Sequence, residues 1–309
     1  MAYNNFSLEF HGEGFVDSKL EFYRANAAAP SLAVLKKIHS CIDLTTLSNA
    51  DNAKSVKALV DIVNTHTANH PGIPNVAGIC VYPKFVSVVK DALKVPGVDI
   101  VSVAGAFPHA QTFTEIKVKE VALAVEAGAD EIDVVINAGD IIAKDYEDAL
   151  NELKAMREAC KSVKMKVILE TGVYKADSDI YDASIIAMEA GADFVKTSTG
   201  KSEPAATPRA MLIMALAVSD YCKATGRRVG IKPAGGIRTS QDAMRYCAIM
   251  EDIFHGDYDN TTFRIGATSL AKNVIADIKA LSSCKKNVKN VSAAKKFFDV
   301  PRTVKFAVC

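Results

Sequence analysis

The sequence predicts an α/β protein with the TIM (β/α)8 barrel fold, from the alternation of its elements and from their number. Short runs rich in β-branched residues recur from about residue 38 onward, and a longer amphipathic stretch follows each run. Strands that alternate with helices pair in parallel, because each helix returns the chain to the edge where the strand began. Eight such units within about 240 residues match the usual size of this barrel.

The predicted strands and helices follow one another in regular order. The strands are Ile38–Leu44, Val76–Val81, Asp99–Val103, Glu131–Ile136, Lys166–Glu170, Asp193–Thr197, Val229–Pro233 and Phe263–Ala267. The helices between them include Phe113–Ala127, Asp145–Ser162, Ile180–Ala190, Thr207–Thr225 and Ser240–Phe254. The residues Glu-Ala-Gly-Ala-Asp occur at 126–130 and again at 189–193, which indicates two copies of one helix-to-strand turn ended by glycine.

Residues 36–281 form the predicted barrel domain, with a segment on either side. Residues 1–35 are expected to add a helix outside the barrel, and residues 282–309 to form a basic C-terminal tail. The tail has seven basic residues and one acid, a net charge of +6, so the rest of the chain carries −5. A solvated tail is the favoured interpretation, and an interaction tail is the alternative.

Composition excludes several classes of protein. The net charge of +1 argues against a general nucleic-acid-binding protein. No apolar run reaches the ~18 residues that cross a bilayer, so no membrane segment is expected. Seven cysteines without regular spacing are more typical of reduced thiols in a cytoplasmic protein than of a disulfide framework.

Two lysines at the ends of apolar strands are the strongest chemical signal. Lys196 and Lys232 end the sixth and seventh predicted strands, and a glycine-containing loop follows each. An ammonium group buried without a partner is costly, so such a position favours the neutral, nucleophilic amine. A structural lysine paired with a carboxylate is the alternative for each. Because the two lysines lie on neighbouring strands, we predict an enzyme that forms an imine.

Three carboxylates could serve these lysines. Asp133 alternates with apolar neighbours on the fourth strand, so its side chain is expected to point into the barrel. It could hold Lys232 and transfer protons, or it could only neutralise a lysine. Asp43 and Glu170 end the first and fifth strands, and each is either a site carboxylate or a polar residue of the barrel interior.

The loops after the last three strands indicate a phosphate site. They read Thr199-Gly200-Lys201, Ala234-Gly235-Gly236 and Gly266-Ala267-Thr268-Ser269. Glycine permits close approach of the backbone, and helix N-termini present free N–H groups to an anion. A single Gly-Gly pair is more often a simple turn. Three such loops in succession are more specific, because barrels often bind phosphate at their last loops.

Other candidate residues carry weaker signals. Cys80 could line a pocket, but a buried structural thiol is the favoured interpretation. His66 and His70 have the i, i+4 spacing of zinc ligands, but no acid or third ligand accompanies them, and we interpret them as surface histidines. Residues 257–260 have too few acids for a calcium loop. The sequence therefore predicts no metal site and no cofactor.

Taken in order, these motifs resemble those of the deoxyribose-phosphate aldolase family. The matching segments are Asp43–Leu47, Ile79–Pro83, Glu131–Val135, Lys166–Gly172, Lys196–Lys201, Lys232–Arg238 and Arg264–Ala267, within about residues 38–275. The resemblance implies a metal-independent class I aldolase that reversibly cleaves 2-deoxy-D-ribose 5-phosphate into D-glyceraldehyde 3-phosphate and acetaldehyde. Its partners would be this phosphorylated sugar and the aldehydes, and a homo-oligomer such as a dimer is compatible with the sequence.

The resemblance also implies a role for each site residue. Lys196 would form the Schiff base, Lys232 would favour its neutral form, and Asp133 would join Lys232 in proton transfer. Asp43, Cys80 and Thr199 would bind the substrate's carbon chain, and Gly200, Lys201, Gly235, Gly236, Thr268 and Ser269 its phosphate. Well-known bacterial members end in a tyrosine, whereas this chain has no tyrosine after Tyr258, so the resemblance assigns no role to the tail.

Two other functions fit part of the pattern. A phosphate-binding barrel enzyme such as a sugar-phosphate isomerase would use Lys196 electrostatically and would form no covalent adduct. An aldolase-like scaffold that binds proteins through its basic tail would be non-enzymatic. The intact lysine pair and acid favour the aldolase.

Overall fold

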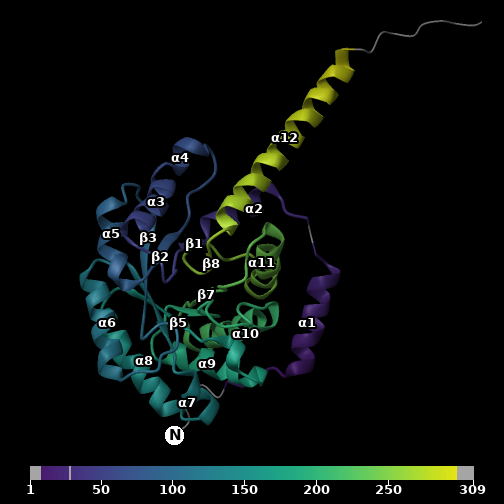
Figure 1. The fold of residues 1–309 in the computed structure, drawn as a ribbon. Coiled ribbons are helices and arrows are strands. Elements are labelled where there is room, and N and C mark those ends of the chain that lie inside the picture. The colour runs from purple at the N-terminus through teal and green to yellow at the C-terminus, as the bar shows by residue number, and fades with distance from the viewer. Residues whose placement is uncertain (1–7, 28, 298–309) are drawn as a thin grey trace, which may run out of the picture.

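The computed structural model describes residues 8–27 and 29–297, with side chains as far as residue 283. Within these residues, eight parallel strands form one sheet in the order β7-β6-β5-β4-β3-β2-β1-β8 (Figure 1). They are β1 (Ile42–Thr45), β2 (Gly78–Val81), β3 (Asp99–Ala104), β4 (Glu131–Val135), β5 (Lys164–Ile168), β6 (Phe194–Lys196), β7 (Gly230–Lys232) and β8 (Ile265–Ala267). Two parallel bridges, Ile231 to Phe263 and Ala234 to Gly266, join β7 to the β8 segment. The predicted barrel is confirmed.

Helices surround the sheet, close to where the sequence predicts them. The longer ones around the barrel are α3 (Ala53–Asn64), α5 (Val86–Ala92), α6 (Thr114–Glu126), α8 (Tyr146–Cys160), α9 (Asp177–Glu189), α10 (Pro208–Thr225), α11 (Ser240–Phe254) and α12 (Leu270–Phe297). Short ones are α4 (His66–Asn69), η1 (Pro83–Phe85), α7 (Ala138–Ala143) and η2 (Thr171–Val173). Outward strand residues such as Ile132 and Val134 belong to the main hydrophobic core with the helices. The alternate residues face the barrel interior.

Further helical segments lie at the two ends of the chain. α1 (Glu13–Ala25) packs outside the barrel against α10 and α11 (Figure 1). α12 packs against α2 (Leu32–Ser40) and then projects away from the barrel (Figure 1). It continues as one helix across residue 282, where the predicted tail begins, and residues 298–309 of that tail lie outside the described residues.

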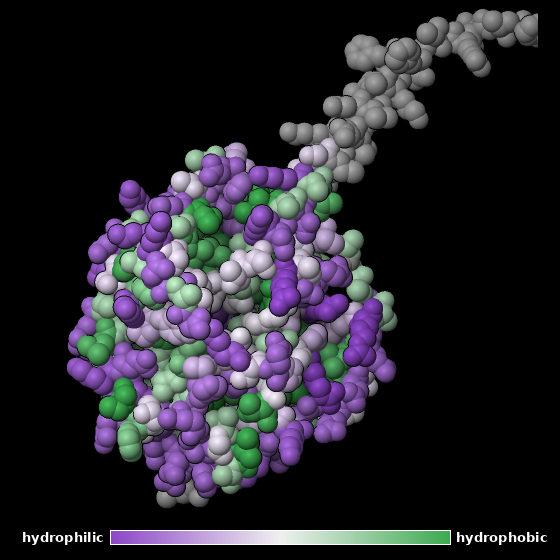
Figure 2. All heavy atoms as spheres, in the orientation of Figure 1, coloured by the Kyte–Doolittle hydropathy of each residue, from purple (hydrophilic) through white to green (hydrophobic). Residues whose placement is uncertain are grey.

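The surface is mostly polar on the face that Figure 2 shows, and its hydrophobic side chains occur in small separate groups. In the described part of the chain, no helix is both long enough and apolar enough to cross a membrane.

The first predicted strand was wrong at its beginning. Residues up to Ser40 belong to α2 (Leu32–Ser40), and the strand starts only at Ile42. Ser31 caps this helix, because its hydroxyl accepts a hydrogen bond from the N–H of Val34 at 3.2 Å. Ile38 lies on the buried face of the helix, where its β-branched side chain fits a helix as well as a strand.

The repeated helix-to-strand turn is confirmed. Gly128 and Gly191 have φ values of 101° and 95°, in the left-handed region that favours glycine. In each turn the next alanine N–H reaches the carbonyl five residues earlier: Ala129 to Ala124 at 3.2 Å, and Ala192 to Ala187 at 3.0 Å. This is the Schellman pattern, which ends both helices and directs the chain into β4 and β6.

Three histidines cluster at the end of the barrel where β1 and β2 begin. His66 was predicted to lie on the surface, but it is buried and its ring stacks on that of His39 with centroids 4.8 Å apart. His70 contacts His66 edge-on at 5.2 Å. The prediction for His66 was wrong because α4 has only four residues, too few for apolar periodicity to reveal its buried side.

Candidate active site

The carboxyl ends of the strands open into a cavity of about 820 Å³. It is lined by eight of the predicted site residues: Lys196, Thr199, Gly200, Lys201, Gly235, Gly236, Thr268 and Ser269. The predicted phosphate-binding residues therefore meet at one wall, although they come from three separate loops. Asp43, Cys80, Asp133 and Lys232 are fully buried and are not among the residues that line the cavity.

Asp133 is the centre of a charged cluster that fills the barrel beneath this cavity. Its Oδ2 lies 2.8 Å from Lys196 Nζ and 2.7 Å from Lys232 Nζ, and its Oδ1 lies 3.0 Å from Lys166 Nζ. Lys196 and Lys232 are paired in register on β6 and β7, so their side chains leave the sheet side by side. The predicted proximity of the two lysines is confirmed.

A second layer of ion pairs supports Asp133 and its lysines. Lys232 Nζ also contacts Asp43 Oδ2 at 2.5 Å, and Lys166 Nζ contacts Glu131 Oε2 at 2.5 Å. Arg264 joins the two carboxylates, with contacts of 2.6 Å to Asp43 and 3.0 Å to Glu131. Asp43 is thus a residue of the barrel interior, where it binds cationic side chains.

These contacts determine the protonation of the buried groups. Burial by itself would raise the pKa of Asp133, but Lys166, Lys196 and Lys232 hold it well below its usual range. Burial would also raise the pKa of Glu131, but the positive charges of Lys166 and Arg264 outweigh burial and lower this pKa to about 2. Burial would lower the pKa of Lys232, but Asp133 and Asp43 raise it above its usual value. Both carboxylates are therefore ionised at neutral pH, and Lys232 is protonated.

The sequence analysis identified Asp43 as a candidate site residue but missed three of its neighbours, Glu131, Lys166 and Arg264. These three were named only within the segments that resemble the aldolase family, and no role was predicted for them. The signal that could have found them is strand alternation. Glu131 lies two residues before Asp133, so it shares the inward face of β4. Lys166 is paired in register with Asp133 across β4 and β5. Arg264 lies two residues before Gly266, where a Cβ atom would lie 3.3 Å from Lys232 Cε and so on the inward face of the strand.

Glycine shapes the wall where the three loops meet. Gly200, Gly235 and Gly236 have φ values of 73°, 87° and 77°, which other residues rarely adopt. A Cβ atom on Gly235 would lie 2.6 Å from Ala205 Cβ, so the loops after β6 and β7 pack too closely for a side chain there. Lys201 Nζ donates to the Leu47 carbonyl at 2.5 Å, which places its ammonium group at this wall.

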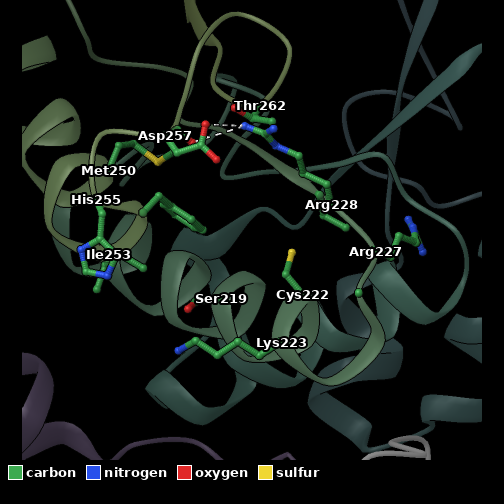
Figure 3. A pocket seen from close by; sticks show the side chains of 13 residues that line it. Ser219, Cys222, Lys223, Arg227, Arg228, Met250, Ile253, His255, Asp257 and Thr262 are labelled. Carbon is green, nitrogen blue, oxygen red and sulfur yellow. Dashed lines mark hydrogen bonds and ion pairs between the residues drawn. The ribbon is translucent and has the colours of Figure 1, made fainter.

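A smaller hollow of about 340 Å³ lies at the opposite end of the barrel, between the carboxyl ends of α10 and α11 (Figure 3). Arg228 and Asp257 form an ion pair at its edge at 3.2 Å. The guanidinium group of Arg227 binds the carbonyl groups of Met188 and Ala192. None of the predicted site residues lines this hollow, so the larger cavity is the candidate active site.

A parallel barrel with buried lysines beneath a glycine-rich cavity is the arrangement that the sequence predicts for an enzyme of the aldolase class. Residues 38–270 match the DeoC/LacD family of aldolases, and the chain belongs to that family. The deoxyribose-phosphate aldolases of Bos taurus and Homo sapiens are 39% and 37% identical to it over 254 residues, 78% of this chain and 80% of each relative. The solved deoxyribose phosphate aldolase of Aeropyrum pernix, described as a unique tetramer, is 26% identical with a TM-score of 0.62, covering 80% of this chain and 93% of that one.

Proposed function

We propose that this protein cleaves 2-deoxy-D-ribose 5-phosphate reversibly into D-glyceraldehyde 3-phosphate and acetaldehyde, through a Schiff base on Lys196. The observation that carries the proposal is the position of Lys196. Of the four bases in the buried charged cluster, Lys196 alone lines the cavity. Its Nζ lies 2.8 Å from Asp133 Oδ2, so a proton acceptor adjoins the nucleophile.

Charge balance in the cluster supports a neutral Lys196. The buried part of the cluster pairs three carboxylates with three other bases, namely Asp43, Glu131 and Asp133 with Lys166, Lys232 and Arg264. At its partly exposed edge, Asp99 and Lys164 add one charge of each sign and contact each other at 3.6 Å. These charges cancel, so a protonated Lys196 would add one uncompensated positive charge to a buried site. Lys232 bridges two carboxylates, whereas Lys196 has only Asp133 and shares it with Lys232. Of the four buried bases, Lys196 therefore has the fewest carboxylate partners.

The reaction follows from this arrangement. Neutral Lys196 Nζ attacks the C1 aldehyde carbon, and the carbinolamine loses water to give an iminium ion. The iminium accepts the electron pair of the C2–C3 bond as the C3 hydroxyl loses its proton, which releases D-glyceraldehyde 3-phosphate and leaves an enamine. Protonation at C2 and hydrolysis then release acetaldehyde. Asp133 Oδ2 contacts both Lys196 and Lys232, so it can pass protons between them during these steps.

The loops after β6, β7 and β8 would hold the phosphate. Lys201 supplies a positive charge, and Gly235 and Gly236 supply backbone that a phosphate can approach closely. Thr268 and Ser269 immediately precede α12, so the free N–H groups of a helix N-terminus lie at the same wall. An anchor at this end of the substrate would hold C1 at Lys196 and lower the entropic cost of reaction.

Product analysis tests the proposal. Incubation with 2-deoxy-D-ribose 5-phosphate should give acetaldehyde and D-glyceraldehyde 3-phosphate in equal amounts. Lys196→Arg should lower turnover by at least about 1,000-fold without changing the circular dichroism spectrum. Lys154→Arg, at an exposed position of α8, is the matched control and should retain full activity. Consumption of the sugar phosphate without a two-carbon product would overturn the proposal in favour of a sugar-phosphate isomerase.

A further inference from the structure

We propose that Glu170 is a positioning residue for the phosphorylated half of the substrate, and that it acts through Thr199 and Lys201. The inference rests on the proposed function, and it concerns a carboxylate that the mechanism above does not use. Glu170 follows β5, and only 7% of its surface is exposed. A carboxylate at this depth requires hydrogen-bond donors, and it finds them on the loop after β6.

Both carboxylate oxygens of Glu170 bind Thr199. The backbone N–H of Thr199 donates to Oε1 at 3.2 Å, and its hydroxyl donates to Oε2 at 2.5 Å. A hydroxyl has a single proton, so this one is committed to Glu170. Thr199 Oγ1 then accepts a hydrogen bond from the backbone N–H of Lys201 at 3.1 Å. A continuous chain of hydrogen bonds therefore runs from Glu170 to Lys201.

This chain determines what the cavity wall offers to a ligand. Thr199 and Lys201 line the cavity, whereas Glu170 lies behind them. Because the proton of Thr199 points to Glu170, Oγ1 can only accept a hydrogen bond, and the matching group on a sugar phosphate is a hydroxyl. The chain also fixes the backbone from which Lys201 extends its ammonium group toward Leu47. Glu170 thus orients one acceptor and one cation without touching the substrate.

The backbone around Glu170 supports a dedicated role. Its φ and ψ angles of 55° and 54° lie in the left-handed region, which residues other than glycine rarely adopt. Glu170 adopts this conformation at the point where the chain turns away from β5. From there its side chain reaches Thr199 on the loop after β6. Two residues further on, a Cβ atom at Gly172 would collide with the carbonyl oxygen of Pro204. The two loops therefore pack directly against each other, and Glu170 is a polar link between them.

Glu170→Gln tests this role with two substrates. Glutamine keeps the size of the side chain but presents an amide N–H to one of the two Thr199 donors, so one hydrogen bond breaks. KM for 2-deoxy-D-ribose 5-phosphate should rise roughly 10- to 100-fold, with a smaller change in kcat. Borohydride trapping of acetaldehyde, which has no phosphate or hydroxyl, should stay within about twofold of wild type. Glu158→Gln, at an exposed position of α8, is the matched control and should change neither quantity.

A double-mutant cycle tests whether Glu170 acts through Thr199. In a Thr199→Val background, Glu170→Gln should raise KM much less than it does in the wild type, because the hydroxyl that it orients is already absent. Thr199→Ser, which keeps the hydroxyl, should restore most of the affinity lost in Thr199→Val. These two Thr199 variants also test the role of the hydroxyl if Glu170→Gln does not fold.

Three results would overturn the inference. They are an unchanged KM in folded Glu170→Gln, additive effects in the cycle, and equal KM values for Thr199→Ser and Thr199→Val. Failure of acetaldehyde trapping in the wild-type enzyme would instead reject the Schiff base on Lys196. The failure of the positioning role and the failure of the proposed function are therefore distinguishable.

Discussion

In the proposed mechanism Lys232 would supply the positive charge beside the nucleophile Lys196, because it bridges Asp43 and Asp133. In Lys232→Leu the cluster keeps three carboxylates but loses one base, so Lys196 becomes a counter-ion and retains its proton. We expect kcat at neutral pH to fall at least about 100-fold, and the profile of kcat against pH to move to higher pH. An unchanged profile in a folded variant would show that Lys232 does not tune the nucleophile.

Lys166 has a structural role in the same cluster, and two lysines of β5 allow a matched comparison. Lys166→Met removes a fully buried base from Glu131 and Asp133, a change that typically costs about 3–5 kcal/mol. Lys164→Met removes a base that is 43% exposed and contacts Glu131 at 3.0 Å, which should cost no more than about 1 kcal/mol. Urea unfolding measures both losses. Equal losses would mean that burial does not set the strength of these pairs.

At the scale of the helices, packing of α2 against α4 makes the protein sensitive to acid. Burial, followed by the neighbouring His66 and His70, lowers the pKa of His39 from 6.5 to about 4. Lys279 of α12 adds a further positive charge near His70. Between pH 4 and pH 6.5, His39 is largely protonated in the unfolded chain and largely neutral in the folded protein, so the unfolded chain binds more protons. The contribution of neutral His39 to stability is therefore complete above pH 6.5, and it is lost progressively as the pH falls toward 4.

This loss should be on the order of 3 kcal/mol, and urea unfolding at pH 7 and pH 4 measures it. His39→Phe keeps an aromatic ring in the stack but cannot be protonated. Its free energy of unfolding should therefore fall less than that of the wild type between the two pH values. The same fall in both proteins would place the acid sensitivity elsewhere.

Local pattern was sufficient to predict most elements but not all of their ends. Apolar alternation and helical spacing placed the strand that carries Asp133 and the helices around it, because each pattern extends over enough residues to be distinctive. The start of β1 was wrong because Ile38 suits both a helix face and a strand. The burial of His66 was missed because four residues of α4 show no period.

At the scale of the whole molecule, closure of the barrel creates contacts that no local pattern contains. Arg264 and Asp43 are 221 positions apart in sequence, and they meet because β8 closes the barrel against β1. Strand alternation predicts which face a residue occupies, but it does not predict its partner across the barrel. Lys196 and Lys232 were predictable as neighbours because consecutive strands of such a barrel are adjacent. The counter-ions beneath them come from more distant strands.

The proposed function thus assigns two tasks to the barrel, with compensated charge in its interior and substrate binding in its loops, and it places Lys196 between them. Borohydride reduction in the presence of acetaldehyde, followed by peptide mass mapping, tests this central claim most directly. A Schiff base on Lys196 predicts one adduct of about 28 Da, confined to the Lys196 peptide and absent from Lys196→Arg. An adduct on Lys232 or Lys201 instead, or no adduct in an enzyme that cleaves the sugar phosphate, would contradict it.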